Sequence, residues 1–310
     1  MSNNSLAFVF PGQGSQSVGM LGKLADESPV IRATFDEASQ VLGYDLWQLV
    51  SQGPADDLNA TEKTQPAMLA AGVATLRLWR ERQKGEPAIV TGHSLGEFTA
   101  LVAAGAIDFG ACIDLVRFRG QVMQQAVPAG TGAMAALLGL EDPDVIAVCA
   151  EAAAAGGVVE AVNFNSQGQV VIAGDKAAVL RAIEMAKGRG AKRAIELPVS
   201  VPSHSSLMKP AGEKLAQRLA GIEVRAPSIR YLSAVDAQEH RDPADIRALL
   251  VRQLSSPVRW TTTVAALVAG GFKTVAECGP GGVLAGLVKR ITRGGDTTVL
   301  ALESPDSFKA

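Results

Sequence analysis

The chain has 310 residues, of which 47% are hydrophobic and 19% charged, with a formal net charge of -2. This length and composition suit one large α/β domain, or a domain with a smaller insert, and exclude a disordered chain. The near-neutral charge argues against a non-specific nucleic-acid binder, which normally carries a basic excess. No apolar run approaches the roughly 18 to 20 residues of a membrane span, and the N-terminus lacks the pattern of a secretory signal.

The spacing of the three cysteines indicates in which cellular compartment the protein works. Cys112, Cys149 and Cys278 lie far apart in apolar surroundings and form no CxxC pair. This pattern is typical of reduced core residues in a cytoplasmic protein. No zinc-binding spacing is present, so we expect no metal and no cofactor.

A first buried strand is predicted over 6–10, where five apolar residues follow one another. It ends at the glycine-rich segment 11–16, which reads PGQGSQ. Such a loop can cradle a phosphate, donate an N–H group to an active site, or form a tight surface turn. Neither of the glycine patterns of phosphate-binding loops is complete here.

Two helices are expected next. Ser28 and Pro29 form an N-cap and first-turn pair, which predicts a helix that ends near Gly43. A second helix is expected to begin at Gln65-Pro66 and to run to Trp79. With the strand that follows at 88–91, this alternation indicates a parallel α/β sheet.

Ser94 lies between this short β-branched strand and a segment of helical periodicity, within Gly92-His93-Ser94-Leu95-Gly96. A strand–turn–helix context is what a G-x-S-x-G nucleophile elbow requires. It also places the N–H of Leu95 at a helix N-terminus, where it can donate to an oxyanion on Ser94. Glu97 falls in the first helical turn, where a carboxylate suits the helix dipole. The alternative is a glycine-rich turn with an incidental serine.

Arg119 interrupts the apolar face of a helix predicted over 110–126. It falls near the middle of the apolar arc, whereas Arg117 points away from it; the arc consists of Cys112, Leu115, Val116, Val122 and Met123. A buried arginine needs an anion, because the guanidinium stays charged. The anion is either an internal Asp or Glu, or a substrate carboxylate or phosphate held by the guanidinium.

A small inserted subdomain is predicted over 130–198, within a large subdomain formed by 1–129 and 199–310. Its pattern is strand (133–138), helix (142–155), two strands (158–162 and 169–173) joined across 163–166, a helix that reaches Lys187, and a strand (191–197). This βαββαβ order is that of a ferredoxin-like unit.

A catalytic histidine is expected where the large subdomain resumes. His204 lies in a proline-flanked loop, which favours an exposed side chain suited to proton transfer. The chain has only two other histidines: His93 is inside the elbow and His240 lies in a charged loop. A serine nucleophile needs a base, so His204 is the best candidate. Further elements are predicted as a helix over 245–254, a strand over 272–276, a helix over 283–291 and a strand over 299–302.

Seven motifs together resemble the malonyl-CoA:acyl carrier protein transacylases, and they come in that family's order over nearly the whole chain. They are Pro11-Gly12-Gln13-Gly14-Ser15-Gln16, Thr64-Gln65-Pro66-Ala67, Gly92-His93-Ser94-Leu95-Gly96-Glu97, Arg117-Phe118-Arg119-Gly120, Asn163-Phe164-Asn165-Ser166, Pro202-Ser203-His204 and Gly279-Pro280-Gly281. The resemblance implies a hydrolase-like parallel-sheet subdomain with a ferredoxin-like insert. Where the family often has cysteine after the loop histidine, this chain has Ser205.

The resemblance also implies a ping-pong reaction. Malonyl-CoA acylates Ser94, and the phosphopantetheine thiol of holo acyl carrier protein then takes the malonyl group. His204 serves as base and then as acid. The remaining implied roles are oxyanion-hole N–H groups from Gln13 and Leu95, a substrate grip from Arg119, Asn165 and His93 beside the substrate, and a backbone carbonyl near Gln253 that orients His204.

Three alternatives stay open at this point: a polyketide-pathway malonyl acyltransferase, an α/β-hydrolase thioesterase and a catalytically silent carrier-binding module. We expect a cytoplasmic monomer that binds neither nucleic acid nor membrane. For carrier docking we predict a basic cluster, with a second cluster at Lys289, Arg290 and Arg293 as the next surface; the first consists of Lys187, Arg189, Lys192 and Arg193.

Overall fold

The structure, a computed structural model, describes residues 5–199 and 201–309. A six-stranded sheet forms the centre of the large lobe, in the order β10-β9-β1-β2-β7-β8, and only the β7–β8 pair is antiparallel. Its strands are β1 (Leu6–Phe10), β2 (Ile89–Gly92), β7 (Arg230–Leu232), β8 (Glu239–His240), β9 (Thr274–Glu277) and β10 (Thr298–Ala301). The sequence-based prediction of a parallel α/β sheet is therefore confirmed.

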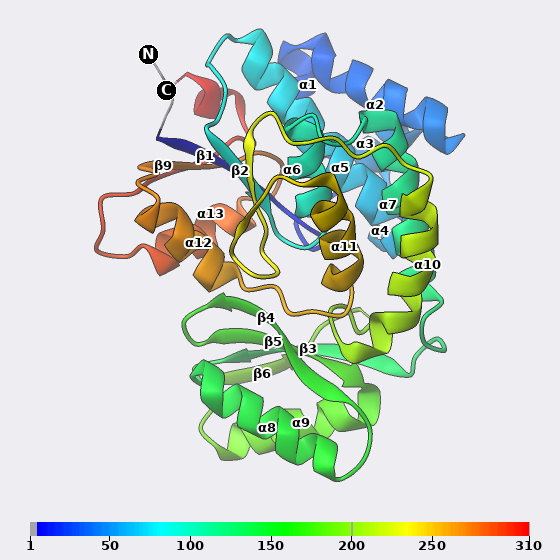
Figure 1. The fold of residues 1–310 in the computed structure, drawn as a ribbon, viewed down its shortest axis with the longest axis vertical. Helices are drawn as coiled ribbons and strands as arrows, with labels where there is room; N and C mark the ends of the chain where they lie inside the picture. The colour runs from blue at the N-terminus through cyan, green and yellow to red at the C-terminus, as the bar shows by residue number, and fades with distance from the viewer. Residues whose placement is uncertain (1–4, 200, 310) are drawn as a thin grey trace.

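Helices cover both faces of this sheet (Figure 1). On one face, α12 (Trp260–Ala269) and α13 (Val283–Ile291) pack on apolar side chains of β1, β2 and β9. The other face carries the main core; its helices are α1 (Gly22–Glu27), α2 (Pro29–Leu42), α3 (Leu46–Gln52), α4 (Ala55–Asn59), α5 (Thr61–Glu81), α6 (Gly96–Ala103), α7 (Phe109–Gln124), α10 (Lys209–Ala220) and α11 (Pro243–Gln253). No helix within residues 5–199 and 201–309 combines the length and apolar character needed to cross a bilayer.

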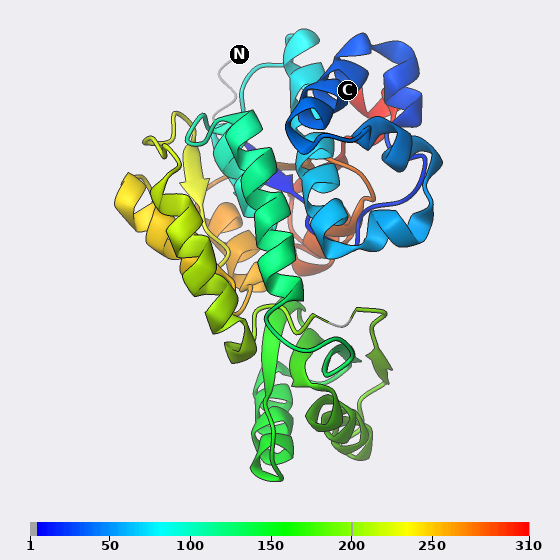
Figure 2. The same cartoon turned by 90° about the vertical axis from the view of Figure 1, so that its right-hand side faces the viewer.

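The inserted residues form a second lobe, which Figure 2 shows below the first. Its antiparallel sheet has the order β4-β5-β3-β6, with both helices on one face, as in ferredoxin-like units. The elements are β3 (Gly132–Leu138), α8 (Asp142–Ala154), β4 (Val159–Ser166), β5 (Gln169–Asp175), α9 (Lys176–Gly188) and β6 (Arg193–Glu196). They span 132–196, inside the predicted boundaries of 130 and 198.

Main-chain bonds tie the two lobes together. The N–H of Phe164 in β4 donates to the carbonyl of Val258 across 2.9 Å, and the N–H of Val258 donates to Val162 across 2.8 Å. Glu160 accepts the N–H of Ser206 at 2.6 Å, two residues beyond His204. Strand β4 is therefore positioned directly against the loops that carry the candidate site.

Two predicted boundaries are wrong. The helix expected from Gln65 begins at Thr61, with Pro66 inside it, because the carbonyl of Ala60 already accepts main-chain bonds from the N–H groups of Lys63 at 2.7 Å and Thr64 at 2.8 Å. Residues 163–166 are not a loop but the end of β4, since they pair with β5 through two register shifts. Strand β5 follows directly in the chain, whereas the main-chain contact of Phe164 with Val258 joins residues far apart in the sequence.

Candidate active site

Ser94 lies on a sharp turn between β2 and α6. Its φ of 52° is in the left-handed region, which costs energy for any residue but glycine. A Cβ at Gly92 would lie 2.0 Å from the carbonyl carbon of Gly96, and one at Gly96 would lie 1.9 Å from the carbonyl oxygen of Phe10. Only glycine fits at both positions, so the turn brings strand and helix close together and lifts the Ser94 hydroxyl above the end of the sheet.

His204 is hydrogen-bonded to this hydroxyl. Its Nε2 lies 2.7 Å from Ser94 Oγ, and its Nδ1 lies 2.9 Å from the carbonyl oxygen of Gln253. A carbonyl oxygen only accepts, so the hydrogen is on Nδ1 and Nε2 is free to take the proton of the serine. Burial, followed by the charge of Arg119, lowers the pKa of His204 to about 3, which keeps the ring neutral.

The predicted exposure of His204 is wrong. The residue is only 3% exposed, because Gln253 at the end of α11 and the elbow close over the loop. Its φ of 67° is also left-handed, so the backbone of this loop is bent to direct the ring at Ser94. The His204–Ser94 contact is therefore shielded from bulk water.

Arg119 is buried beside the serine on α7, with 1% of its surface exposed. Its guanidinium donates to Gln65 Oε1 at 2.8 Å, to Gln253 Oε1 at 3.0 Å and to Ser94 Oγ at 3.3 Å. It makes no ion pair with any carboxylate in the part of the chain that the structure describes, and its buried Nε has no partner there. This excludes the internal ion pair that the sequence left open.

The charge of Arg119 persists at neutral pH. Burial lowers its pKa to about 10, and the nearby carboxylate of Glu97 opposes this shift. A buried cation without a carboxylate partner, directed at a nucleophile, has the charge and hydrogen-bond donors that suit an anionic group.

The predicted oxyanion-hole residues lie on the two loops that meet here. Leu95 precedes α6, and Gln13 follows β1. A Cβ at Gly12 would lie 2.5 Å from the carbonyl oxygen of His93, so the glycine-rich loop passes close to the elbow. The next helix after this loop begins only at Gly22, which does not fit a phosphate cradle at a helix N-terminus. The arrangement favours the N–H donor interpretation.

His93 and Asn165 meet beside the nucleophile. The Nε2 of His93 lies 2.9 Å from Asn165 Oδ1, and the imidazole contacts the ring of Trp260 with centroids 5.6 Å apart. Burial lowers the pKa of His93, so its ring is neutral and Nε2 donates to the amide oxygen. The contact brings β4 of the small lobe to the elbow.

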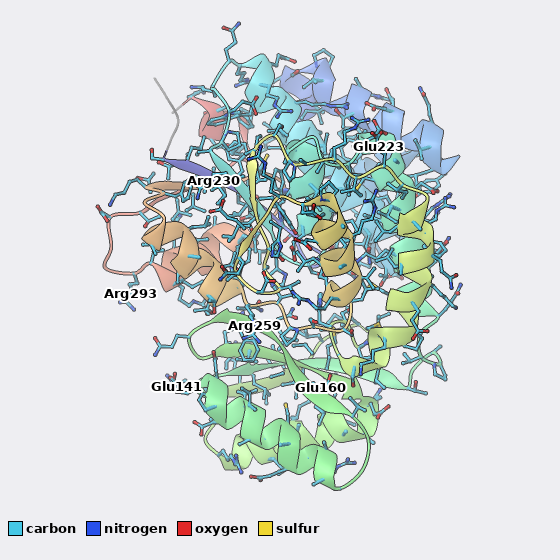
Figure 3. The ribbon with its side chains drawn as sticks, viewed as in Figure 1. Glu141, Glu160, Glu223, Arg230, Arg259 and Arg293 are labelled. Atoms are coloured by element: carbon cyan, nitrogen blue, oxygen red, sulfur yellow. The ribbon has the colours of Figure 1, made fainter. Side chains whose placement is uncertain are left out.

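Sequence reasoning missed the polar groups that hold Arg119. Gln65 lies inside one of the seven motifs, but nothing in the sequence indicates its role, and for Gln253 the resemblance implies only a main-chain carbonyl that orients His204. A partnership of Glu97 with the helix dipole does not by itself indicate the complete burial that the structure shows for this residue. Polar residues within apolar helix faces were the available signal. Figure 3 shows the side chains around the junction of the lobes, with Glu160 and Arg259 labelled there.

Comparisons with known proteins agree with this geometry. A family model described as an acyl transferase domain matches residues 7–304. Curated malonyl CoA-acyl carrier protein transacylases from Haemophilus influenzae and Escherichia coli are 55% and 54% identical to this chain, over 98% of it and 97% of their own length. The chain belongs to the malonyl-CoA:acyl carrier protein transacylase family.

Solved structures of this transacylase family superpose closely on the chain. An acyl carrier protein S-malonyltransferase from Vibrio cholerae is 55% identical, with a TM-score of 0.95 over 98% of this chain and 99% of that one. A malonyl-CoA:acyl carrier protein transacylase from Xanthomonas oryzae reaches 0.97 at 52% identity, over 100% and 98% of the chains. A malonyl-transacylase solved with a type II polyketide acyl carrier protein is 52% identical, with a TM-score of 0.95 over 98% of both.

Proposed function

We propose that this protein transfers the malonyl group of malonyl-CoA to the phosphopantetheine thiol of acyl carrier protein, for fatty-acid biosynthesis, through an ester on Ser94. The observation that carries the proposal is the buried guanidinium of Arg119, which lies 3.3 Å from Ser94 Oγ and has no carboxylate partner in the described residues. Malonyl-CoA is a thioester whose acyl group ends in a carboxylate, so it supplies both the electrophile and the anion.

In the first half-reaction, Ser94 Oγ attacks the thioester carbonyl while His204 Nε2 takes the hydroxyl proton. The resulting oxyanion accepts hydrogen bonds from the N–H groups of Leu95 and Gln13. Collapse of this intermediate breaks the carbon–sulfur bond, and His204 returns its proton to the departing CoA sulfur. Arg119 binds the distal carboxylate throughout, which orients the acyl group without taking part in bond changes.

The second half-reaction is the same sequence in reverse with a different thiol. His204 takes the proton of the phosphopantetheine thiol, whose sulfur attacks the Ser94 ester, and Ser94 Oγ leaves with that proton. The product is malonyl-carrier protein and free enzyme. The chemistry needs only side chains and main-chain N–H groups, so we propose no metal and no cofactor.

A polyketide carrier protein is the second candidate acceptor. The observation that favours it is the 52% identity to the malonyl-transacylase solved with such a carrier. A hydrolase-type thioesterase is less well supported, because those enzymes orient their histidine with an acidic side chain, whereas His204 here meets the main-chain carbonyl of Gln253. Parallel assays with purified fatty-acid and polyketide carrier proteins decide the acceptor.

Intact-mass measurement tests the core of the proposal. After incubation with malonyl-CoA the protein should gain one malonyl group, and Ser94→Ala should gain none. An adduct that persists in Ser94→Ala would remove Ser94 from the mechanism, and release of malonate to water without transfer would favour a thioesterase.

The proposal includes a monomeric, cytoplasmic enzyme. Free, buried thiols at all three cysteines are in keeping with a reducing compartment. Light scattering of the purified protein measures the oligomeric state, and a mass of a dimer would contradict this part of the proposal.

A further inference from the structure

Glu97 is a completely buried carboxylate beside the nucleophile. It lies in the first turn of α6, three residues after Ser94, and its side chain is 0% exposed. Three side chains donate to it: Gln253 Nε2 at 2.9 Å, the Ser233 hydroxyl at 2.8 Å and the Tyr231 hydroxyl. The carboxylate is therefore held in one place by donors from β7, the segment after it, and α11.

The amide of Gln253 connects this carboxylate to the site. Its Nε2 donates to Glu97 Oε1 at 2.9 Å and to the carbonyl of Ser94 at 3.0 Å, and its Oε1 accepts from Arg119 at 3.0 Å. If the amide were reversed, its oxygen would face two acceptors and its nitrogen would face a donor. Only the observed orientation satisfies all three neighbours.

Glu97 and Arg119 do not touch, although they lie in the same buried region; burial raises the pKa of the Glu97 carboxyl, and its hydrogen bonds oppose that rise. The amide of Gln253 lies between them, accepting from the guanidinium and donating to the carboxylate. A hydrogen-bonded chain of this kind in a low-dielectric interior polarises each of its members. The guanidinium of Arg119 is thereby held beside Ser94. Its unpaired Nε–H group is not occupied by any carboxylate of the described residues and stays available to a substrate.

We propose that Glu97 is a positioning residue for malonyl selectivity: it fixes the Gln253 amide so that Oε1 faces Arg119 and the guanidinium points at the acyl group on Ser94. The inference rests on the proposed function, since it concerns how that site favours a malonyl over an uncharged acyl group. Acetyl-CoA has no carboxylate for Arg119 and should depend far less on this alignment.

The direction in which the preference for malonyl-CoA changes distinguishes a positioning role of Glu97 from an effect of its charge. Removal of a nearby anion strengthens the attraction of Arg119 for a substrate carboxylate. Loss of the Glu97 charge alone should therefore preserve or raise the preference for malonyl-CoA. A lower preference can come only from lost alignment.

Two substitutions use this difference. In Glu97→Gln the new amide oxygen can accept from Gln253 Nε2, while its NH₂ group donates to the hydroxyl oxygen of Tyr231 or Ser233. In Glu97→Leu no acceptor remains. We expect the ratio of kcat/KM for malonyl-CoA to that for acetyl-CoA to fall by about tenfold in Glu97→Leu and to stay level or rise in Glu97→Gln.

A double-mutant cycle tests whether Glu97 acts through Gln253. Gln253→Leu removes the amide but keeps the main-chain carbonyl that orients His204. Adding Glu97→Leu to Gln253→Leu should change the malonyl-to-acetyl ratio no further. If Glu97→Leu does not fold, the pair Tyr231→Phe and Ser233→Ala loosens Glu97 while leaving it in place, and it must lower the ratio by at least about threefold.

Equal losses for both substrates in Glu97→Leu would overturn the inference, as would a ratio that falls equally in Glu97→Gln or independent effects in the cycle. Each of these outcomes leaves the proposed function intact. That function fails by a different result, namely a wild-type protein that acquires no malonyl group on Ser94.

Discussion

The Nδ1 of His204 donates to the main-chain carbonyl of Gln253 across 2.9 Å. A carbonyl cannot ionise, so this contact fixes the orientation and tautomer of the ring wherever the ring is neutral. Unlike a carboxylate, the carbonyl does not offer a full negative charge to the imidazolium, and the adjacent Arg119 disfavours that cation further. This base is therefore neutral at rest and returns its proton readily to the leaving thiol.

The pH profile of acylation should reflect this environment. Because the pKa of His204 is lowered to about 3 from an ordinary 6.5, the basic form persists well into the acid range. Between pH 8 and pH 5.5 we expect kcat/KM for malonyl-CoA to change by less than about twofold, where an ordinary histidine would lose roughly tenfold. Stopped-flow measurement of the acylation rate tests this pH dependence. A decline in the rate centred near pH 6.5 would contradict the prediction.

Arg119→Ala should cost malonyl transfer far more than acetyl transfer. Truncation leaves the malonyl carboxylate unpaired in a desolvated site, a loss of about 2 to 5 kcal/mol by analogy with buried charged pairs. Arg117→Ala is the matched control, because Arg117 lies on the same helix, pairs with Asp114 and is partly exposed. The measurement is kcat/KM for both thioesters, and equal losses in Arg119→Ala would make its role structural.

Stability measurements test whether the elbow requires glycine at position 96. In Gly96→Ala the added methyl would lie 1.9 Å from the carbonyl oxygen of Phe10, so main chain must move. We expect the free energy of unfolding to fall by about 2 to 4 kcal/mol. In Gly286→Ala, at an exposed position of α13, the methyl meets nothing within 4 Å, and the free energy of unfolding should rise by about 0.5 to 1 kcal/mol. Urea unfolding of both variants measures these changes. Similar unfolding midpoints for the two variants would contradict the predicted clash at Gly96.

Features that depend on neighbouring residues in the chain could be predicted from the sequence, whereas contacts between distant residues could not. Ser94 could be recognised because its strand, turn and helix are consecutive in the chain. Arg119 could be flagged because a cation interrupted an apolar helix face. The Glu97–Gln253 contact joins residues 156 positions apart, and its existence depends on α11 packing against the elbow. No local pattern contains that information.

The burial of His204 illustrates the same limit. A proline-flanked loop is usually exposed, but here the elbow and Gln253 enclose it. Likewise, residues 163–166 looked like a turn because Asn and Ser favour turns, and only their pairing with β5 and the bond to Val258 extend the strand. Tertiary partners overrode local preference in both places.

The remaining prediction concerns the surface that receives the carrier protein. Within the first basic cluster, Lys187 pairs with Glu184 at 2.7 Å and Arg189 pairs with Glu151, so half of its charge is neutralised. Lys192 and Arg193 form no ion pair within the described residues and are exposed. They therefore carry the free positive charge of this cluster.

The two predicted basic clusters lie at the same end of the small sheet. Arg193 and Gln169 both pair with Leu138 of β3, and Arg290 of α13 hydrogen-bonds Gln169. Arg290 also reaches the hydroxyl of Ser166 at 3.4 Å, next to Asn165 in β4. Figure 3 labels Arg293, which belongs to the second cluster. The basic surface that we expect to dock the carrier therefore runs from Lys192 and Arg193 to Lys289, Arg290 and Arg293.

Charge reversal tests this surface. Carrier proteins of the type implied by the resemblance are acidic, so complementary charge should mainly raise the association rate. In Lys192→Glu/Lys289→Glu we expect KM for the carrier protein to rise by about tenfold at low salt, with a flatter salt dependence and unchanged acylation by malonyl-CoA. Lys187→Glu/Arg189→Glu is the matched control with the same change in charge, and it should have the smaller effect because those two side chains already have acidic partners. A larger effect in the control would place docking on the α8–α9 side of the small lobe.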